Sequence, residues 1–241
     1  MRKNRKAKKA AGIKTISIHH GETFSQETGC VTPPIFTTST FQHGNQGDFD
    51  YTRSGNPNFK ILENVLKAIE DANYCTVFSS GIAAVTAITS SLKSGDTILC
   101  ESNLYGCTIR MFERVFKKFG LNTHYCDFTK NESIQNICKI NPALIWLESP
   151  TNPLLKILNL KAICEEANSK NIPVVVDNTF CTPIIQKPLE IGSTLSLIST
   201  TKFINGHSDA LGGAVLTNSE DWSRKMIFAQ KSLGLNPSPF D

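Results

Sequence analysis

Two polar residues that follow apolar segments have the side chains needed for chemistry on an amino acid. Lys202 lies among hydroxyl side chains just after the apolar run 195–198, and Asp177 directly follows Val174–Val176. A lysine amine can form a Schiff base with an aldehyde, and a carboxylate can keep a pyridinium nitrogen protonated. These are the two groups that pyridoxal phosphate (PLP) needs. Lys202 alone would be interpreted as a surface lysine, so the PLP interpretation depends on the residues around it.

Other residues could bind the phosphate of such a cofactor. Ser79-Ser80-Gly81 follows a short apolar run and opens an alanine-rich segment that begins at Ile82. A strand, a turn and a helix N-terminus in this order present free backbone N–H groups to an anion. Arg53, in the turn-forming run 51–57, offers a fork of donors that suits phosphate. Each feature is weak alone, because Ser-Ser-Gly is also common at helix N-caps and an isolated turn arginine is often merely exposed.

Apolar patterning predicts the elements that position these residues. Near-continuous apolar runs predict buried strands, and apolar residues at helical spacing predict helices between them. This alternation indicates an α/β fold with a mostly parallel sheet that is covered on both faces. The predicted strands are 75–78, 97–100, 121–126, 143–148, 173–177 and 195–198, and the predicted helices are 58–70, 82–88, 108–119, 134–140 and 159–170.

The candidate residues share one position relative to this sheet. In open α/β sheets, ligands bind beyond the carboxyl ends of the strands. Residues that follow predicted strands should therefore meet at one edge of the sheet. They are Gly81, Tyr105, Asn152, Asp177 and Lys202.

Residues 1–57 are predicted to form an N-terminal arm, and 58–241 a single α/β domain. Residues 1–50 show little helical periodicity, and their prolines and glycines indicate extended chain and loop. An extended arm buries little of itself, so it is expected to pack on another surface. Its basic residues 1–10 are predicted to be a disordered, solvated tail.

Composition excludes several classes of protein. The 241 residues are 40% hydrophobic, which is enough to bury a core. The net charge is +4, and six positive charges lie within 2–9, so no nucleic-acid-binding surface is expected. No apolar stretch is long enough for a membrane span or placed as a secretory signal. Eight scattered cysteines without a C-x-x-C pair favour a reduced, cytoplasmic protein over a disulfide framework or a metal site.

The chain resembles the PLP-dependent enzymes of Cys/Met metabolism, which include cystathionine γ-synthase, cystathionine γ- and β-lyases, methionine γ-lyase and homoserine sulfhydrylases. The resemblance covers nearly the whole chain after the basic segment. It implies the large domain of the aspartate-aminotransferase-like fold, known as fold type I. The motifs that carry it are Tyr51–Pro57, Ser79–Gly81, Leu104–Gly106, Glu148–Pro153, Val176–Phe180, Thr201-Lys202 and Gly206–Asp209.

The resemblance implies catalytic roles for three residues. Lys202 would bind the PLP aldehyde and later transfer protons, and Asp177 would keep the ring nitrogen protonated. Tyr105 would stack on the ring and assist proton transfer. Asn152 would bind the phenolic oxygen of the ring.

The resemblance also implies a phosphate site built from two segments. Gly81 and Ile82 would offer backbone N–H groups, and Ser199 and Thr201 would offer hydroxyls. In this family the residues that match Tyr51 and Arg53 reach the phosphate of a neighbouring subunit. A complete site would then require a homo-oligomer, expected to be a dimer of dimers in the full-length form.

Transsulfuration is the activity that the resemblance implies. We expect γ-replacement of the cystathionine γ-synthase type, in which the thiol of cysteine replaces the γ-acyloxy group of an O-acylhomoserine. The alternative is γ-elimination by a cystathionine γ-lyase or a methionine γ-lyase. Cys107, two residues after Tyr105, is shared with methionine γ-lyases, whereas Phe180 and the run 206–213 fit cystathionine γ-synthase and the lyases at least as well as they fit methionine γ-lyases.

The end of the sequence departs from the family pattern. Family members continue into a smaller C-terminal domain that carries an arginine for the α-carboxylate of the substrate. This sequence ends at Asp241, where that domain is expected to begin, so the small domain is predicted to be absent. A further alternative is therefore a truncated remnant that binds PLP without catalysis.

Overall fold

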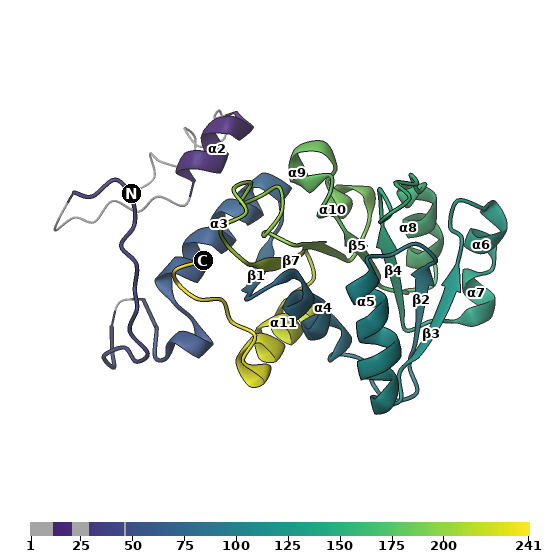
Figure 1. The fold of residues 1–241 in the computed structure, drawn as a ribbon, viewed down its shortest axis with the longest axis horizontal. Coiled ribbons are helices and arrows are strands. Elements are labelled where there is room, and N and C mark those ends of the chain that lie inside the picture. Colours follow the sequence, from purple (N-terminus) through teal and green to yellow (C-terminus); the bar gives the residue numbers. More distant parts are fainter. Residues whose placement is uncertain (1–11, 21–28, 46) are drawn as a thin grey trace.

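A sheet of seven strands, with helices on both faces, organises the chain in the computed structural model (Figure 1). The structure describes residues 12–20, 29–45 and 47–241, so the basic segment 1–10 lies outside the described residues. The strands are β1 (Tyr74–Phe78), β2 (Thr97–Glu101), β3 (Asn122–Cys126), β4 (Leu144–Glu148), β5 (Val174–Asp177), β6 (Leu195–Ile198) and β7 (Gly213–Thr217).

Helices connect most of these strands. Several are a single turn long, and the longer ones cover the sheet. The helices are α2 (Ile13–His19), η1 (Thr52–Ser54), α3 (Pro57–Glu70), α4 (Gly81–Thr89), α5 (Gly106–Arg110), η2 (Met111–Val115), η3 (Phe116–Phe119), α6 (Asn131–Gln135), α7 (Ile137–Ile140), α8 (Leu160–Asn168), α9 (Thr182–Ile185), α10 (Pro188–Ile191) and α11 (Glu220–Leu233).

The predicted α/β fold with a mostly parallel sheet is confirmed. The strand order is β1-β7-β6-β5-β4-β2-β3, and β6, β5, β4, β2 and β3 pair in parallel. β7 runs antiparallel to both of its neighbours, β1 and β6. The chain passes from β2 to β3 at one edge of the sheet and returns to β4 on the other side of β2. Loops after β2 and β4 therefore diverge, which opens a crevice at the carboxyl ends of the strands.

Alternate residues of each central strand point into different cores. Leu144 and Trp146 pack with α4, η2 and α11, whereas Ile145 and Leu147 pack with α8 on the opposite face. A strand with both faces buried must be apolar at every position, which explains the continuous apolar runs. A third cluster lies under α3 and includes Leu66.

The predicted elements are present, with differences in detail. The predicted helix 108–119 is a continuous segment of three kinds of helix, α5, η2 and η3. The predicted helix 134–140 is two short helices, α6 and α7. β7 and α11 were not predicted. α11 nevertheless has clear start and stop signals, with the side chain of Ser219 capping its N-terminus and Gly234 in the left-handed conformation at its C-terminus.

The N-terminal region differs from the extended arm that the sequence predicts. Residues 13–19 form helix α2, which has no buried residue and lies near α3 in Figure 1. Its apolar residues were too few to show a periodic stripe. Buried Asn56 ties the arm to the domain, because its side chain accepts from the N–H of Asn58 at the start of α3 and donates to the carbonyl of Phe36. The boundary at residue 57 between arm and domain stays a prediction.

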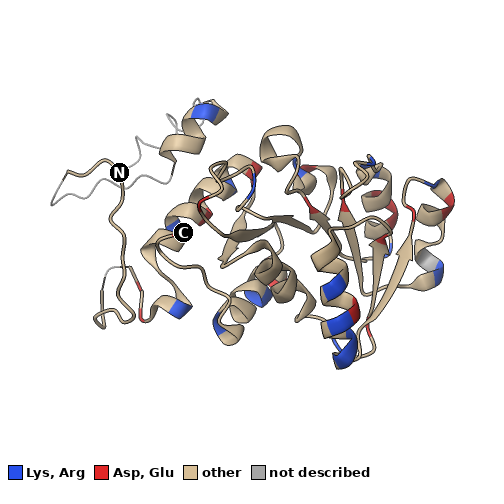
Figure 2. Cartoon of the chain, in the orientation of Figure 1, with Lys and Arg blue, Asp and Glu red and all other residues tan. Residues whose placement is uncertain are grey.

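Charged residues surround the sheet and are nearly absent from it (Figure 2). The seven described strands contain three residues of the Asp, Glu, Lys and Arg types, and each ends its strand. These three are Glu101, Glu148 and Asp177, and all are buried. Among the described residues, no helix has both the length and the apolar character needed to cross a membrane.

Candidate cofactor and active site

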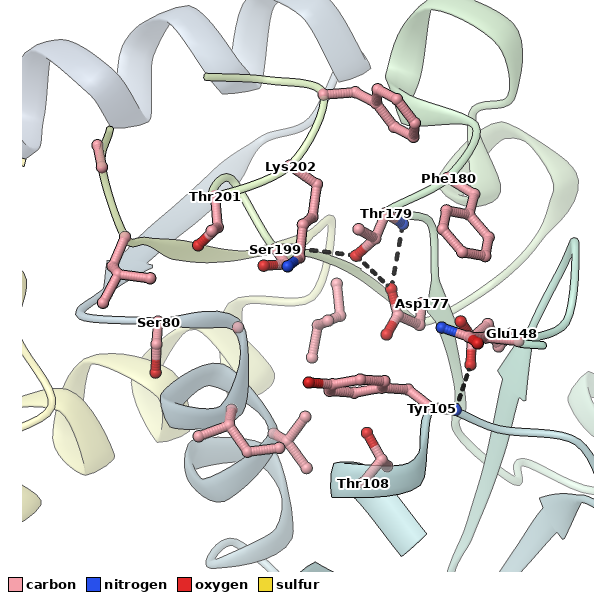
Figure 3. Close-up of a pocket in the computed structure, with 18 of the residues that line it drawn as sticks. Ser80, Tyr105, Thr108, Glu148, Asp177, Thr179, Phe180, Ser199, Thr201 and Lys202 are labelled. Atoms are coloured by element: carbon pink, nitrogen blue, oxygen red, sulfur yellow. Dashed lines mark hydrogen bonds between the residues drawn. The ribbon is translucent and has the colours of Figure 1, made fainter. Parts of the chain in front are cut away.

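A cavity of about 1020 Å³ lies at the carboxyl ends of the strands (Figure 3). Loops after β1, β2, β4, β5 and β6 contribute to its walls, as the topology requires. Eight of the ten candidate residues line it. They are Gly81, Ile82, Tyr105, Asn152, Asp177, Ser199, Thr201 and Lys202.

The N-terminus of α4 forms one end of the cavity. Ser80 caps this helix, with its hydroxyl accepting from the N–H of Ala83 at 3.1 Å. In the described part of the chain, the N–H groups of Gly81 and Ile82 have no acceptor, which leaves two aligned donors for an anion. A Cβ at Gly81 would lie 2.7 Å from the Cβ of Ser199, so glycine is required for this close approach.

Asp177 presents a buried carboxylate to the cavity. Its Oδ1 accepts from both the N–H and the hydroxyl of Thr179, at 3.1 and 2.6 Å. Figure 3 shows its second oxygen directed toward the ring of Tyr105. Burial raises the pKa of Asp177, and the two hydrogen bonds from Thr179 oppose that rise. A cationic ring nitrogen here would find a desolvated carboxylate whose orientation is already fixed.

Glu148 lies beside Asp177 and was not among the predicted site residues. Its side chain lines the cavity and is 5% exposed, and its Oε2 accepts the backbone N–H of Tyr105 at 2.7 Å. Burial, followed by the charge of Asp177, raises the pKa of Glu148 to about 8. The two carboxyl groups therefore resist being ionised together.

The segment after β6 carries Lys202 and two hydroxyl residues. Figure 3 shows the side chain of Lys202 pointing into the cavity, with its amine beside Ser199. The hydroxyl of Thr201 donates to the carbonyl of Gly212 at 3.2 Å and accepts from its N–H at 3.0 Å. If the Thr201 hydroxyl donated a hydrogen bond to a phosphate, that bond would replace its present hydrogen bond to the carbonyl of Gly212.

Asn152 stands in a tight loop after β4. Thr151 stabilises this loop, because its N–H donates to the carbonyl of Lys156 and its hydroxyl accepts the N–H of Lys156, at 3.0 Å each. The loop brings the amide of Asn152 to the wall of the cavity. This placement is compatible with binding of a ring oxygen.

Tyr51 and Arg53 do not join the other candidates in this chain. The guanidinium carbon of Arg53 lies 5.4 Å from the centre of the Tyr51 ring, and its Nη1 donates to the backbone carbonyl of Lys231 at 2.8 Å. Tyr51 is 41% exposed. The pair is preorganised at the surface, and its predicted contact with a second subunit stays a prediction.

Sequence reasoning also missed Thr179 as a site residue. Thr179 bonds to Asp177 and accepts the N–H of Ser199 at 2.9 Å, so it joins the ends of β5 and β6. A Thr two residues after an Asp is a known local pattern for such a bond and could have signalled it. Glu148 could have been found only from the strand register, which pairs it with Asp177.

Comparison with known proteins agrees with this geometry. The family described as Cys/Met metabolism PLP-dependent enzyme matches residues 14–241. The chain is 41% identical over 233 residues to a probable cystathionine gamma-synthase of Herpetosiphon aurantiacus, covering 95% of this chain and 73% of that protein. It is also 41% identical to the cystathionine gamma-lyase of Dictyostelium discoideum, covering 95% of this chain and 60% of that protein.

A solved structure shows the same fold. It is the cystathionine gamma synthase from Xanthomonas oryzae pv. oryzae in complex with aminoacrylate and cysteine, with a TM-score of 0.91 and 36% identity. The match covers 96% of this chain and 61% of that chain. The mostly parallel α/β sheet of this chain therefore has the fold type I architecture of these solved structures. The chain belongs to the Cys/Met metabolism PLP-dependent enzyme family.

Proposed function

We propose that this protein binds PLP in the cavity and uses it for transsulfuration. The observation that carries the proposal is the convergence of Lys202, Asp177 and the N-terminus of α4 in one cavity. The residues fit the cofactor. The Gly81 cradle would hold a phosphate, the buried Asp177 would bind a ring nitrogen, and the Tyr105 ring would cover one face.

When bound, PLP supplies an electron sink for negative charge at the carbon that bears the amino group. The residues of the chain would do the remaining work. Lys202 would hold the cofactor covalently and, once displaced by a substrate amine, would move protons from the substrate carbons. Asp177 would keep the ring nitrogen charged, and Tyr105 would fix the ring plane. Burial of the carboxylate strengthens its pairing with a cation.

We favour γ-replacement, in which the sulfur of cysteine loses its proton and forms a bond to the γ-carbon of an O-acylhomoserine, while the bond from that carbon to the ester oxygen breaks and the acyl group leaves as a free carboxylate. γ-Elimination from cystathionine or methionine is the second candidate, because both synthases and lyases occur among the relatives at similar identity. The chain spans about three fifths of the length of most of these relatives. Transsulfuration by this chain is therefore proposed, as is the choice between the two reactions. A reduced, cytoplasmic location is part of the same proposal.

The second part of the proposal is a homo-oligomer. Tyr51 and Arg53 lie outside the cavity of their own chain and face solvent with a phenol and a guanidinium. We propose that they reach the cofactor phosphate of a neighbouring subunit. This arrangement would give the N-terminal arm a surface to pack on.

The first test is PLP binding by wild type and by Lys202→Ala. Wild type should show an absorption band of bound PLP that survives dialysis, and borohydride should fix the cofactor to Lys202. The variant should show no such band. Lys161→Ala is the matched control, since its side chain is 77% exposed on α8 and does not line the cavity. A folded wild type without the band would contradict the proposal.

The reaction is tested with substrates. Cystathionine formation from an O-acylhomoserine and cysteine would support γ-replacement. Ketoacid release from cystathionine with little replacement would favour γ-elimination. Loss of the bound PLP in Arg53→Ala, with recovery on mixing with a Lys202→Ala chain, would support sites shared between subunits.

A further inference from the structure

Two carboxyl groups lie side by side at the edge of the cavity. Glu148 ends β4, Asp177 ends β5, and the two residues are paired in the parallel register. Paired residues of parallel strands point to the same face of a sheet. Glu148 lies two residues after Trp146, and Asp177 lies two residues after Val175. Trp146 and Val175 both pack in the core on the side of α4 and α11. Glu148 and Asp177 thus share one face and one cavity.

Glu148 also connects two loops. Its Oε2 accepts the N–H of Tyr105 at 2.7 Å, across 43 residues of sequence. Tyr105 directly precedes α5, so this bond fixes the backbone that carries the aromatic ring. Figure 3 shows the bond below the carboxylate of Asp177. In the described part of the chain this is the hydrogen bond that anchors the Tyr105 backbone N–H.

A second negative charge beside Asp177 would be costly. Glu148 is 5% exposed and Asp177 is 8% exposed, so water screens neither carboxyl group well. Asp177 receives two donors from Thr179, whereas Glu148 receives one backbone N–H. Donors stabilise the ionised form, so the negative charge resides on Asp177 and the proton on Glu148.

We propose that Glu148 is a positioning residue of the cofactor site, which anchors the backbone of Tyr105 and, by holding a proton, leaves Asp177 as the single anion facing the ring nitrogen. This inference rests on the proposed function, and it names a residue that acts through two others. One carboxyl oxygen accepts the Tyr105 N–H while the other carries the proton, so a neutral Glu148 serves both purposes.

Other ionisable groups of the cavity are compatible with this assignment. Lys202 lines the same cavity and is an exposed residue. Asp209 and Asp241 belong to the same cavity wall and are exposed to solvent. The ionisable residues that line the cavity are Tyr105, Glu148, Asp177, Lys202, Asp209 and Asp241.

Binding of 4′-deoxypyridoxine 5′-phosphate, a PLP analogue without the aldehyde, tests the positioning role by calorimetry at pH 7. Glu148→Gln keeps an acceptor and no charge, so its affinity should stay within about threefold of wild type. Glu148→Ala should weaken binding about tenfold. Glu148→Leu fills the space without an acceptor and replaces the alanine variant if that protein does not fold.

A double-mutant cycle separates positioning from direct contact. In a Tyr105→Ala background, Glu148→Ala should weaken binding by less than about twofold further, because its effect passes through Tyr105. Glu63→Gln is the matched control. Glu63 also has a pKa raised to about 7 by burial, but it belongs to α3 and does not line the cavity, so its variant should bind as wild type does.

The proton on Glu148 is tested without any cofactor. A carboxyl with a pKa of about 8 in the folded chain and 4.5 as its ordinary value takes up a proton on folding. Its contribution to stability therefore falls as pH rises from about 4.5 to about 8 and is constant above that. The melting temperature of Glu148→Gln, relative to wild type, should rise across this window.

Three results would overturn the proposal. They are a Glu148→Gln protein that binds as poorly as Glu148→Ala, a full loss that persists in the Tyr105→Ala background, and a melting-temperature difference that is flat with pH. Failure of wild type to bind the analogue would instead contradict the proposed function. In that case the pH dependence of the melting temperature still decides whether Glu148 holds the proton.

Discussion

Glu101 and Glu148 are buried glutamates that end neighbouring parallel strands, but their carboxyl groups differ in the number of hydrogen-bond donors that contact them. The Glu101 carboxylate accepts from the hydroxyl of Ser102 at 2.8 Å and from the N–H groups of Asn103 and Phe128 at 3.0 and 2.9 Å. Glu148 accepts one N–H and has another carboxyl group beside it. Glu101 follows Cys100 and lies on the face of the sheet away from the cavity, whereas Glu148 opens into it.

The difference separates a structural carboxylate from a functional one. The donors that surround Glu101 offset the free-energy cost of removing its charge from water. Through them, its carboxylate connects the loop after β2 to the loop after β3. Glu148 lacks such compensation, and its pKa is raised to about 8. A residue that costs stability in this way is typical of a site that is organised for a ligand. Glutamates at the ends of neighbouring strands are thus stabilised by several donors on one face and by a single donor on the face that opens into the cavity.

The largest effect is expected for Glu101→Ala. This change leaves the partly buried N–H of Asn103 and the buried N–H of Phe128 without their acceptor. Two orphaned donors should lower the free energy of unfolding by about 4 kcal/mol. Urea denaturation of the cofactor-free protein measures it. A loss below about 1 kcal/mol would show that water replaces the carboxylate and that the two glutamates are less different than the structure indicates.

Asp177→Asn is expected to have the next largest effect, on binding. Asparagine can still accept from Thr179 but cannot pair with a cationic ring nitrogen, so affinity for the PLP analogue should fall roughly tenfold to hundredfold. The pKa of Glu148 should fall below about 8, because Asp177 contributes to its rise. Calorimetry measures the first change, and NMR titration of the glutamate carboxyls measures the second. An unchanged Glu148 pKa would mean that burial alone sets it.

Sequence patterns predicted most of the sheet and most of the site for identifiable reasons. A strand buried on both faces must be a continuous apolar run, so β4 and β5 were evident. β7 was missed because it begins at Gly213, the second of two consecutive glycines, and such a pair is typical of a loop. Gly213 is required there, since a Cβ would lie 2.3 Å from the carbonyl oxygen of Ser80.

The role of Glu148 depends on information that one sequence does not contain. Lys202 and Asp177 were recognisable from residue type and from their place after apolar runs. Glu148 has the same place, but its relation to Asp177 requires the register of β4 and β5. Its bond to Tyr105 requires the loop after β2 to fold back over β4. Three-dimensional pairing of this kind is a property of the sheet and leaves no local signal.

The smallest effect is expected for Thr179→Val, which makes the surroundings of Asp177 resemble those of Glu148. Valine removes the hydroxyl that donates to Asp177 and accepts the N–H of Ser199, which should cost about 1 to 2 kcal/mol in urea denaturation. The pKa of Asp177 should rise further, because the Thr179 bonds lower it.

Thr179→Ser tests the cause, since it restores the hydroxyl and should recover most of the stability and the analogue affinity. If valine and serine behaved alike, the hydroxyl would not be what distinguishes Asp177. If only valine weakens binding, the contrast between the carboxyl groups follows from their donors. Asp177 is then the anion because Thr179 supplies two hydrogen bonds, and Glu148 keeps the proton because Tyr105 supplies one.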